Sequence, residues 1–360
     1  MKQRNKEKQR IAVLFGGDST EHQVSLRSSI DVVRSINRKK YDLTLIGVNK
    51  DGCWTLCNEN QHVLNVDNLN TICLGPSRCC LAVVPGKSGI QLINSANGFL
   101  FPSVDVVFSL LHGACGENGS MQGLLRVMNI PHVGPDVLAS AICIDKDMTK
   151  RVLRDAGILV TPSITLLRNA DSISLDIDSI IDQLGLPLFI KPARQGSSIG
   201  ITKVNYSTDF KLALELAFSY DSKVIVEQEI CGREISIALL GNDFPEVSVC
   251  GEIFPNSEFY DYDAKYLNDS QATLVAPAKL SMDISHDLIE IARKAYLVLE
   301  CNVMARIDFF LSNRGTILLN EVNTLPGFTS LSIYPKLWEA SGLDYPDLLD
   351  RLITLAIDRR

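Results

Sequence analysis

The chain has 360 residues, of which 46% are hydrophobic and 21% are charged, and its 35 basic and 42 acidic side chains leave a formal net charge of −7. These values are ordinary for a folded globular protein and exclude a disordered, collagen-like or coiled-coil chain. The acidic balance argues against a nucleic-acid partner, although it is compatible with a local basic pocket for a small anion.

Two features predict a cytoplasmic protein without a membrane partner. No apolar run reaches the roughly 18 residues that a transmembrane helix needs. The basic stretch MKQRNKEKQR is followed only by IAVLF before Gly16, which is too short for the core of a signal peptide. The ten cysteines lack the paired spacing of a zinc site, so we expect most of them to be small buried hydrophobic residues.

Strand-like and helix-like segments alternate in the first third of the chain, which predicts an α/β fold. We expect a buried parallel strand over 11–15, a glycine turn and a helix over about 24–36. A second strand starts at Tyr41, and residues 51–97 are expected to form short β pieces. A further buried strand over about 104–111 leads into the turn HGACGENG and a helix. The repeat of strand, glycine turn and helix is typical of a doubly wound domain.

Two more units are expected in the rest of the chain. The second contains a helix over about 139–156, the strands LPLFIKP and GITKV around a glycine loop, and the helix DFKLALELAF. The strand KVIVEQE, which begins at Lys223, is expected to open the third unit, followed by REISIALLG, a long loop near 254–270 and a helix near 283–299. VMARIDFFL and TILLNEV are then predicted to be neighbouring strands joined by the turn SNRG, and two helices end the chain.

The strongest chemical signal lies on these last two strands. Residues two apart share one face of a strand, so Arg306 and Asp308 point the same way, as do Glu321 and Asn323. If the strands pair, Asp308, Glu321 and Asn323 form an oxygen-rich patch beside a guanidinium. Such a patch suits magnesium that takes its other ligands from phosphates and water. The alternative is an exposed polar strand face without a ligand.

The loop KPARQGSSIG, residues 191–200, is the second signal. Lys191 ends an apolar strand, and the glycines and serines that follow have backbone N–H groups that can cover a phosphate chain. The loop is not a Walker A motif, because GxxxxGK[ST] is absent from the sequence. Lys146 would be a second phosphate cation. The alternatives are an ordinary Gly-Ser turn and a solvated lysine.

Three other segments place polar residues beside glycines or aromatic residues. Glu21 lies in GGDSTEHQVSLRSS, and for this segment alone plain helix-start chemistry is the favoured interpretation. His112 ends a strand and opens HGACGENGSMQG, at the sheet edge where α/β proteins bind ligands, but the glycine spacing is not the dinucleotide-binding GxGxxG. EFYDYDAKY, residues 258–266, is either a surface loop without a role or a lid whose Lys265 reaches a phosphate.

Taken together, these segments resemble the D-alanine–D-alanine ligase family of the ATP-grasp superfamily. The resemblance runs in order over nearly the whole chain and is carried by GGDSTEHQVSL, HGACGENGSMQG, AICIDK, KPARQGSSIG, VIVEQ, FYDYDAKY, ARIDFF and NEVNTLPGFTS. It implies a three-domain ATP-grasp architecture, with a doubly wound N-terminal domain over 1–134, a central subdomain over 135–226 and a C-terminal subdomain over 227–360. The nucleotide is expected between the central and C-terminal α+β domains, and the first substrate on the N-terminal side.

The resemblance also implies the reaction, which joins two D-alanines for peptidoglycan precursors. The carboxylate of the first D-alanine attacks the γ-phosphate of ATP to form an acyl phosphate, and the amine of the second then displaces phosphate. Phosphorylation supplies a leaving group that a carboxylate lacks at neutral pH, so positioning and charge neutralisation carry most of the catalysis. Two magnesium ions, with manganese as a substitute, and a homodimer are implied as well.

The residue roles that the resemblance implies fall into four groups. The expected catalytic residues hold the first D-alanine, close the lid or stabilise developing charge: Glu21, Ser197, Lys265, Tyr266, Arg306 and Gly327. The residues expected near the two substrate carboxylates are His112, Ser332 and Ile333. The residues expected to bind ATP at its phosphates or adenosine are Lys146, Lys191, Ser198, Glu227, Glu234 and Lys265. The expected metal ligands are Asp308, Glu321 and Asn323.

The sequence departs from the commonest family pattern at three positions. Asn118 replaces the acid of the GEDG turn, Leu331 stands where His or Tyr is frequent, and Cys115 replaces a small or polar residue. None of these is a metal or phosphate position, so the predicted reaction class is unaffected. Leu331, however, flanks the cradle expected for the second substrate.

The predicted product is D-alanyl-D-alanine, because residues 260–266 read YDYDAKY, as in the D-alanine enzymes. D-alanine–D-serine and D-alanine–D-lactate ligases of the glycopeptide-resistance type are the alternative, and they differ in this string. Another ATP-grasp ligase is disfavoured by Glu21, His112 and the segment TLPGFTSLS, and a Rossmann oxidoreductase by the missing GxGxxG. A catalytically silent nucleotide-binding regulator is a remote alternative, since the predicted metal ligands and Arg306 are all present.

Overall fold

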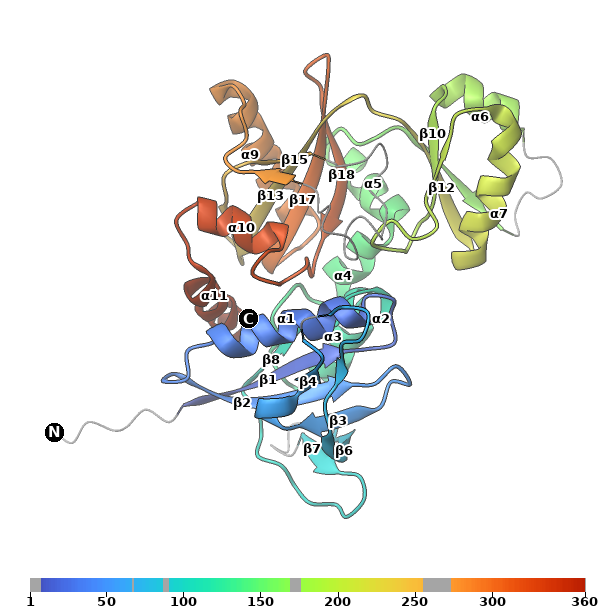
Figure 1. Cartoon of the computed structure of the whole chain (residues 1–360). Coiled ribbons are helices and arrows are strands. Elements are labelled where there is room, and N and C mark those ends of the chain that lie inside the picture. The colour runs from blue at the N-terminus through green and yellow to red at the C-terminus, as the bar shows by residue number, and fades with distance from the viewer. Residues whose placement is uncertain (1–7, 67, 87–90, 169–175, 255–272, 360) are drawn as a thin grey trace.

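The computed structural model describes residues 8–66, 68–86, 91–168, 176–254 and 273–359. Three main sheets organise the molecule, and Figure 1 shows the N-terminal sheet below, the C-terminal sheet above it and a smaller central sheet to one side. The α/β fold class predicted from the sequence is confirmed. Among the helices in these described ranges, none has the length and apolar character that crossing a membrane requires.

The N-terminal sheet has the strand order β7-β6-β3-β2-β1-β8. Strands β1, β2 and β8 run parallel, and β3, β6 and β7 extend the sheet in antiparallel fashion. The predicted strand at Ile11–Phe15 is fully buried, as expected for a strand covered on both faces. The elements of this part are β1 Gln9–Gly16, α1 His22–Ser35, β2 Tyr41–Val48, β3 Trp54–Cys57, η1 Glu59–Gln61, β4 Val63–Leu64, β5 Cys73–Leu74, β6 Ser77–Val83, β7 Leu92–Asn94, β8 Val106–Ser109, α2 Ala114–Glu117 and α3 Ser120–Val127.

The central sheet is antiparallel, has the order β11-β10-β12-β9, and packs against α6 and α7 in a core of its own. The prediction that the strand beginning at Lys223 opens the third unit is wrong, because this strand pairs with β9 and β10. The sequence of a buried strand does not show which strands it pairs with. Its pattern of apolar residues alone could therefore not assign this strand to a sheet. The elements are β9 Ser163–Leu167, α6 Ile177–Leu184, β10 Leu188–Pro192, β11 Thr202–Val204, η2 Ser207–Asp209, α7 Phe210–Tyr220 and β12 Lys223–Gln228.

The C-terminal sheet has the order β16-β15-β13-β17-β18, with β14 paired to β13, and all of its pairings are antiparallel. Helices α4, α5 and α9 pack against one side of it in a shared core. The elements of this part are α4 Val137–Ile144, α5 Lys146–Asp155, β13 Gly232–Gly241, β14 Glu246–Val247, β15 Gly251–Phe254, β16 Thr273–Val275, α9 Met282–Val298, β17 Val303–Ser312, β18 Ile317–Asn323, α10 Ile333–Ala340 and α11 Tyr345–Asp358.

The single helix predicted over 139–156 is in fact two helices, α4 and α5. The chain leaves helical geometry at Asp145, whose backbone is extended (φ −90°, ψ 98°). The Asp145 carboxylate caps α5 by accepting the N–H of Met148 at 3.1 Å. As a result Lys146 becomes the first residue of a buried helix N-terminus and not part of a continuous helix surface.

The N-terminal and C-terminal parts share one hydrophobic core, because α10 and α11 pack between their sheets. Phe15, Leu26 and Phe108 of the N-terminal part belong to the same buried cluster as Trp338 and Leu352. Figure 1 shows α11 lying beside α1. The domain ranges 1–134, 135–226 and 227–360 stay a prediction, since this core and the packing of α4 and α5 both cross them.

The expectation that most cysteines are buried is wrong. Four are buried and five are exposed, and Cys79 is intermediate. The buried thiols lie in the hydrophobic cores, whereas the exposed ones lie on loops, on strands β5 and β6, and in the short helix α2.

Candidate active site

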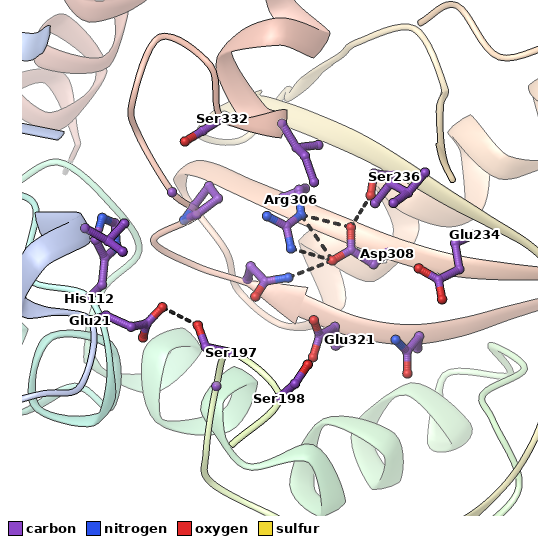
Figure 2. Close-up of a pocket in the computed structure, with 18 of the residues that line it drawn as sticks. Glu21, His112, Ser197, Ser198, Glu234, Ser236, Arg306, Asp308, Glu321 and Ser332 are labelled. Atoms are coloured by element: carbon purple, nitrogen blue, oxygen red, sulfur yellow. Dashed lines mark hydrogen bonds and ion pairs between the residues drawn. The ribbon is translucent and has the colours of Figure 1, made fainter. Parts of the chain in front are cut away.

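A cavity of about 680 Å³ is lined by residues from the central and C-terminal sheets, from α1, and from the turns that follow β1 and β8. Its size falls in the range of small-molecule sites. Figure 2 shows Glu21, His112 and Ser197 on one side of this cavity and Arg306, Asp308 and Glu321 on the other. The site therefore lies where the three structural parts meet.

The carboxylate of Asp308 is the most strongly held polar group of the cavity. The predicted pairing of its strand is confirmed: Arg306 lies opposite Asn323 and Asp308 opposite Glu321 in the β17–β18 ladder. Arg306 reaches Asp308 through Nε at 2.9 Å and Nη2 at 2.7 Å, and Asn323 donates Nδ2 at 2.9 Å. Ser236 on β13 donates its hydroxyl to the other carboxylate oxygen at 2.5 Å. Hydrogen bonds from the neighbouring strands β13 and β18 thus hold Asp308 in place, and the strand pairing sets it beside Glu321, another predicted metal ligand.

Two buried lysines form the cationic wall of the cavity. Lys146 donates Nζ to the carbonyl oxygen of Gln195 at 2.8 Å, and the same atom lies 3.9 Å from Glu321 Oε2. Lys191, at the end of β10, lies 2.5 Å from Glu227 Oε2. Burial lowers the pKa of Lys146, although the charge of Glu321 opposes this effect. Both cations are thus largely withdrawn from water, where their attraction to a phosphate is stronger than at a surface.

The glycine-serine loop after β10 adopts an unusual backbone. Ser197 and Ser198 have φ values of 51° and 61°, in the left-handed region that non-glycine residues rarely occupy. Two consecutive residues of this kind store strain, which accumulates at functional sites. The conformation brings the Ser197 hydroxyl to the carboxylate of Glu21, and Figure 2 marks this hydrogen bond between two distant segments of the chain.

Glu21 lies at the start of α1 but does not act as a helix cap. Its side chain makes no capping hydrogen bond and is turned into the cavity, toward Ser197. The favoured interpretation of this segment as plain helix-start chemistry is therefore wrong. A helix cap can be predicted from neighbouring residues alone. The side chain of Glu21 instead contacts Ser197, which lies far along the chain.

His112 and Glu117 form a buried pair beside Glu21. Nδ1 of His112 lies 3.9 Å from Glu117 Oε1, and the same oxygen accepts the N–H of Gly113 at 3.1 Å. Burial lowers the pKa of His112, so its imidazole is neutral near pH 7. Burial and the negative charge of Glu21 raise the pKa of Glu117 to about 8. Sequence reasoning missed Glu117, because a glutamate in a glycine turn gives no sign that it is buried.

A third group of residues lies at the N-terminus of α10. Ser332 precedes the helix, and its hydroxyl accepts the N–H of Thr329 at 3.1 Å. A Cβ at Gly327 would come within 3.2 Å of this hydroxyl, so a glycine allows the two segments to approach closely. Asp31 of α1 holds the intervening loop by accepting both the N–H and the hydroxyl of Ser330, at 2.8 and 3.0 Å. The first N–H groups of a helix offer a cradle for an anion such as a carboxylate.

The remaining part of the cavity has apolar walls. Phe189, Ile253 and Phe310 line it next to the carboxylates of Glu227 and Glu234. Apolar walls with a few polar groups suit a flat, hydrogen-bonding ring system.

All of the predicted site residues in the described part of the chain line this single cavity. They are Glu21, His112, Lys146, Lys191, Ser197, Ser198, Glu227, Glu234, Arg306, Asp308, Glu321, Asn323, Gly327, Ser332 and Ile333. Lys265 and Tyr266 lie outside the described residues. Ser236 and Glu117 are lining residues that sequence reasoning missed, and only the fold shows that Ser236 faces Asp308.

Comparison with known proteins agrees with this arrangement. The chain matches the family sequence models described as "D-ala D-ala ligase N-terminus" at residues 10–135 and "D-ala D-ala ligase C-terminus" at 152–354. It is 68% identical to D-alanine–D-alanine ligase of Sodalis glossinidius over 356 residues, which cover 99% of this chain and 97% of that protein. It is 50% identical to D-alanine–D-alanine ligase A of Escherichia coli K12 over 353 residues, or 98% and 97% of the two chains.

Solved structures show the same likeness. The D-alanine–D-alanine ligase of Coxiella burnetii has a TM-score of 0.84 and 36% identity, with coverage of 98% of this chain and 95% of that chain. The VanG D-Ala:D-Ser ligase of Enterococcus faecalis has a TM-score of 0.85 and 37% identity, with coverage of 97% and 100%. With family models that match most of its length and full-length relatives at 50% and 68% identity, the chain belongs to the D-alanine–D-alanine ligase family.

Proposed function

We propose that this cavity joins two D-alanines to D-alanyl-D-alanine at the expense of ATP, as a step of peptidoglycan precursor synthesis. The observation that carries the proposal is the meeting of three groups in one cavity: the buried lysines, the carboxylate patch of β17 and β18, and the Glu21–Ser197 pair. The names of the curated relatives support the same reaction. Each group has a distinct task in the ligation.

ATP would bind between the central and C-terminal sheets. Lys146, Lys191 and the backbone around Ser198 would hold the phosphates, because these groups are the cations and left-handed loop of the cavity. Glu227 and Glu234 would face the adenosine, with Glu234 at the ribose hydroxyls. This placement is an extension of the family resemblance, supported by the apolar walls beside the two glutamates.

The residues of the carboxylate patch fit two magnesium or manganese ions. Asp308, Glu321 and Asn323 offer oxygen donors, which these hard cations prefer. Within the described ranges, no three His, Cys, Asp or Glu side chains gather as a metal-binding group, so phosphate oxygens and water would complete the coordination. When bound, the ions would neutralise phosphate charge, and Ser236 would keep Asp308 oriented toward them.

The first step is attack of the D-alanine carboxylate on the γ-phosphate of ATP. Glu21, held by Ser197, would bind the ammonium of this D-alanine, and neutral His112 would donate a hydrogen bond beside its carboxylate. These contacts would orient a weak nucleophile toward the γ-phosphate. Such positioning alone can lower the activation barrier substantially. The products of the step are an acyl phosphate and ADP.

The second step is attack of the amine of the second D-alanine on the acyl carbon. Ser332 and the N–H of Ile333 would hold its carboxylate at the start of α10. Negative charge then develops on the carbonyl oxygen, and Arg306 and the N–H of Gly327 would stabilise this oxyanion. Collapse of the intermediate breaks the carbon–oxygen bond to phosphate, the amine nitrogen loses a proton to the departing phosphate or to water, and the new amide remains.

The choice of D-alanine as second substrate is tested by phosphate release. D-Ala alone should support turnover, and adding D-Ser or D-lactate at neutral pH should not accelerate it. The dipeptide is identified by mass spectrometry. The structural likeness to the VanG D-Ala:D-Ser ligase makes this comparison necessary, and faster turnover with either mixture would overturn the choice.

Lys265 lies outside the described residues, and its lid role stays a prediction that mutagenesis tests. Lys265→Ala should leave the Kd for ATP close to that of the wild type and abolish ligation. Ligation near the wild-type rate would remove the lid role. A cytoplasmic location and a homodimer are part of the same proposal, and light scattering of the purified chain measures the assembly.

A further inference from the structure

Lys150 is a buried lysine to which the proposed reaction gives no task. It lies one helical turn after Lys146 on α5 and is 1% exposed. Its Nζ lies 3.0 Å from Glu227 Oε1 and donates to the carbonyl oxygen of Thr161 at 3.3 Å. Lys150 is not among the described residues that line the cavity, so it acts on the site from behind Glu227.

Glu227 is held between two lysines. The residue is 3% exposed, with carboxylate oxygen Oε1 directed to Lys150 and Oε2 to Lys191. A buried carboxylate without a cation would take up a proton, because burial disfavours the charged form. Here burial acts to raise the pKa of Glu227, but the charges of Lys150 and Lys191 outweigh it and hold the pKa below its ordinary value. Glu227 is therefore ionised and fixed in orientation.

The two lysines are not equivalent in this arrangement. Lys191 lines the cavity and faces the space proposed for the phosphates, so a bound polyphosphate competes with Glu227 for its charge. Lys150 is not among the described residues that line the cavity, and the carboxylate that it pairs with is that of Glu227. Lys150 can therefore keep Glu227 charged and in place while Lys191 is engaged by the nucleotide.

We propose that Lys150 is a positioning residue of the nucleotide site, which holds Glu227 as a fixed, ionised acceptor and thereby favours a 6-aminopurine triphosphate over a 6-oxopurine triphosphate. The inference rests on the proposed function, in which Glu227 faces the adenosine. An ionised carboxylate only accepts hydrogen bonds, so it pairs with the 6-amino group of adenine and repels the 6-oxo group of guanine. Sites built around a buried acceptor discriminate strongly against a ligand that leaves it unpaired.

The test compares Lys150→Met with two matched variants. Lys150→Arg keeps the buried charge, and Arg151→Met removes a charge from the next residue of the same helix, where the side chain is 61% exposed and pairs with Asp147. The measurements are kcat, KM for ATP, GTP and D-Ala, and the Kd for ATP by calorimetry. Thermal melting checks that each variant is folded.

Lys150→Met should raise the KM and Kd for ATP roughly 10- to 100-fold, as for outer-shell partners of metal ligands. The KM for D-Ala should stay within about twofold, and the preference for ATP over GTP should fall about tenfold or more. Lys150→Arg should recover most of the ATP affinity, and Arg151→Met should match the wild type. An unchanged KM for ATP in folded Lys150→Met, or an equal loss in every parameter without rescue by arginine, would overturn the inference.

A double variant keeps the test valid if Lys150→Met does not fold. Lys150→Met/Glu227→Gln removes both charges of the pair and is compared with Glu227→Gln alone. If Lys150 acts through Glu227, the two should have the same Kd for ATP, whereas a further large rise would contradict the inference. Calorimetric ATP binding also separates this test from the proposed function, because a failure of ligation would leave the binding comparison intact.

Discussion

Several polar side chains of the site contact Asp308. Arg306 contacts it through two guanidinium nitrogens, Nε and Nη2. The guanidinium is only partly exposed and lines the cavity beside Asp308, where the oxyanion is proposed to form. A residue that stabilises charge only in the transition state affects kcat more than substrate binding. The oxyanion role proposed for Arg306 should therefore be visible in kinetics.

Arg306→Met is expected to lower kcat roughly 10²- to 10³-fold, the usual effect of losing one oxyanion donor. Steady-state kinetics with D-Ala and ATP measures the change. Arg314→Met, in the exposed SNRG turn, is the control and should retain wild-type kcat. A kcat for Arg306→Met within threefold of the control would remove Arg306 from the oxyanion site.

Glu117 is expected to give the protein a pH-dependent stability. Its pKa is about 8 in the folded protein, against an ordinary value of 4.5, so the folded state binds an extra proton between these values. Stability therefore falls as pH rises through this window. The melting temperature of the wild type should drop more between pH 5.5 and 8.5 than that of Glu117→Gln, which has no such proton. Parallel curves for the two proteins would contradict a raised pKa at Glu117.

Among the elements, α5 connects the backbone of the fold to the proposed nucleotide site. Its cap, Asp145, fixes where the helix starts and also pairs with Lys223 of β12 at 2.8 Å. The first residue of the helix is Lys146, whose N–H donates to the carbonyl oxygen of Ala193 at 3.0 Å. The end of β10 and the start of α5 are thus held together, and they carry Lys191 and Lys146, the two lysines proposed to bind the phosphates.

Asp145→Ala should lower the free energy of unfolding by about 1 kcal/mol, as for a lost helix cap, and should raise the KM for ATP. Asp176→Ala is a matched control, because Asp176 caps α6 by accepting the N–H of Ser179 at 3.0 Å, outside the cavity lining. It should cost similar stability without changing the KM for ATP. Denaturant unfolding measures the loss of stability, and steady-state kinetics measures the KM for ATP. Equal KM values in the two variants would show that the Asp145 cap does not affect ATP binding.

The elements also show how far the sequence predicts this structure. The pairing of β17 and β18 was predictable, because their polar residues alternate with apolar ones and a short turn joins them. The break between α4 and α5 was not, because one capping hydrogen bond decides it. Nor was the sheet that contains β12, because a buried strand is apolar whichever partners it has.

The candidate site divides in the same way. Residues in recognisable strings, such as Asp308 and Lys191, could be predicted from the sequence. Ser236 and Lys150 could not, because each contacts a partner far along the chain that only the fold brings near. Glu117 could not either, because its partners are local but nothing in the glycine turn shows that its carboxyl group is buried. For Glu21, the family resemblance indicated a role and a contact with Ser197, and the structure contains this hydrogen bond.

At the scale of the whole molecule, the central sheet is the part with an independent core. Its helices and strands form a separate buried cluster, whereas the N-terminal sheet shares a core with α10 and α11. The cavity lies between these two bodies. A nucleotide that fills it is therefore expected to tie the central sheet to the rest of the protein.

Hydrogen–deuterium exchange measures this effect. ATP with magnesium, in the absence of D-Ala, should slow amide exchange in β10, in the loop after it and in β18. The antiparallel strands β3 and β6 of the N-terminal sheet serve as an internal control and should exchange unchanged. Protection limited to the N-terminal sheet would place the nucleotide elsewhere.

The fate of one oxygen atom tests the central claim, that this cavity activates a D-alanine carboxylate by phosphorylation. The reaction is run with ATP, magnesium and D-Ala labelled with ¹⁸O in both carboxylate oxygens, and the released phosphate is analysed by mass spectrometry. Attack on the γ-phosphate followed by displacement transfers one ¹⁸O from the first D-Ala to each phosphate, alongside one D-alanyl-D-alanine. Dipeptide formed with unlabelled phosphate would contradict the acyl phosphate route and the roles assigned to the residues of the cavity.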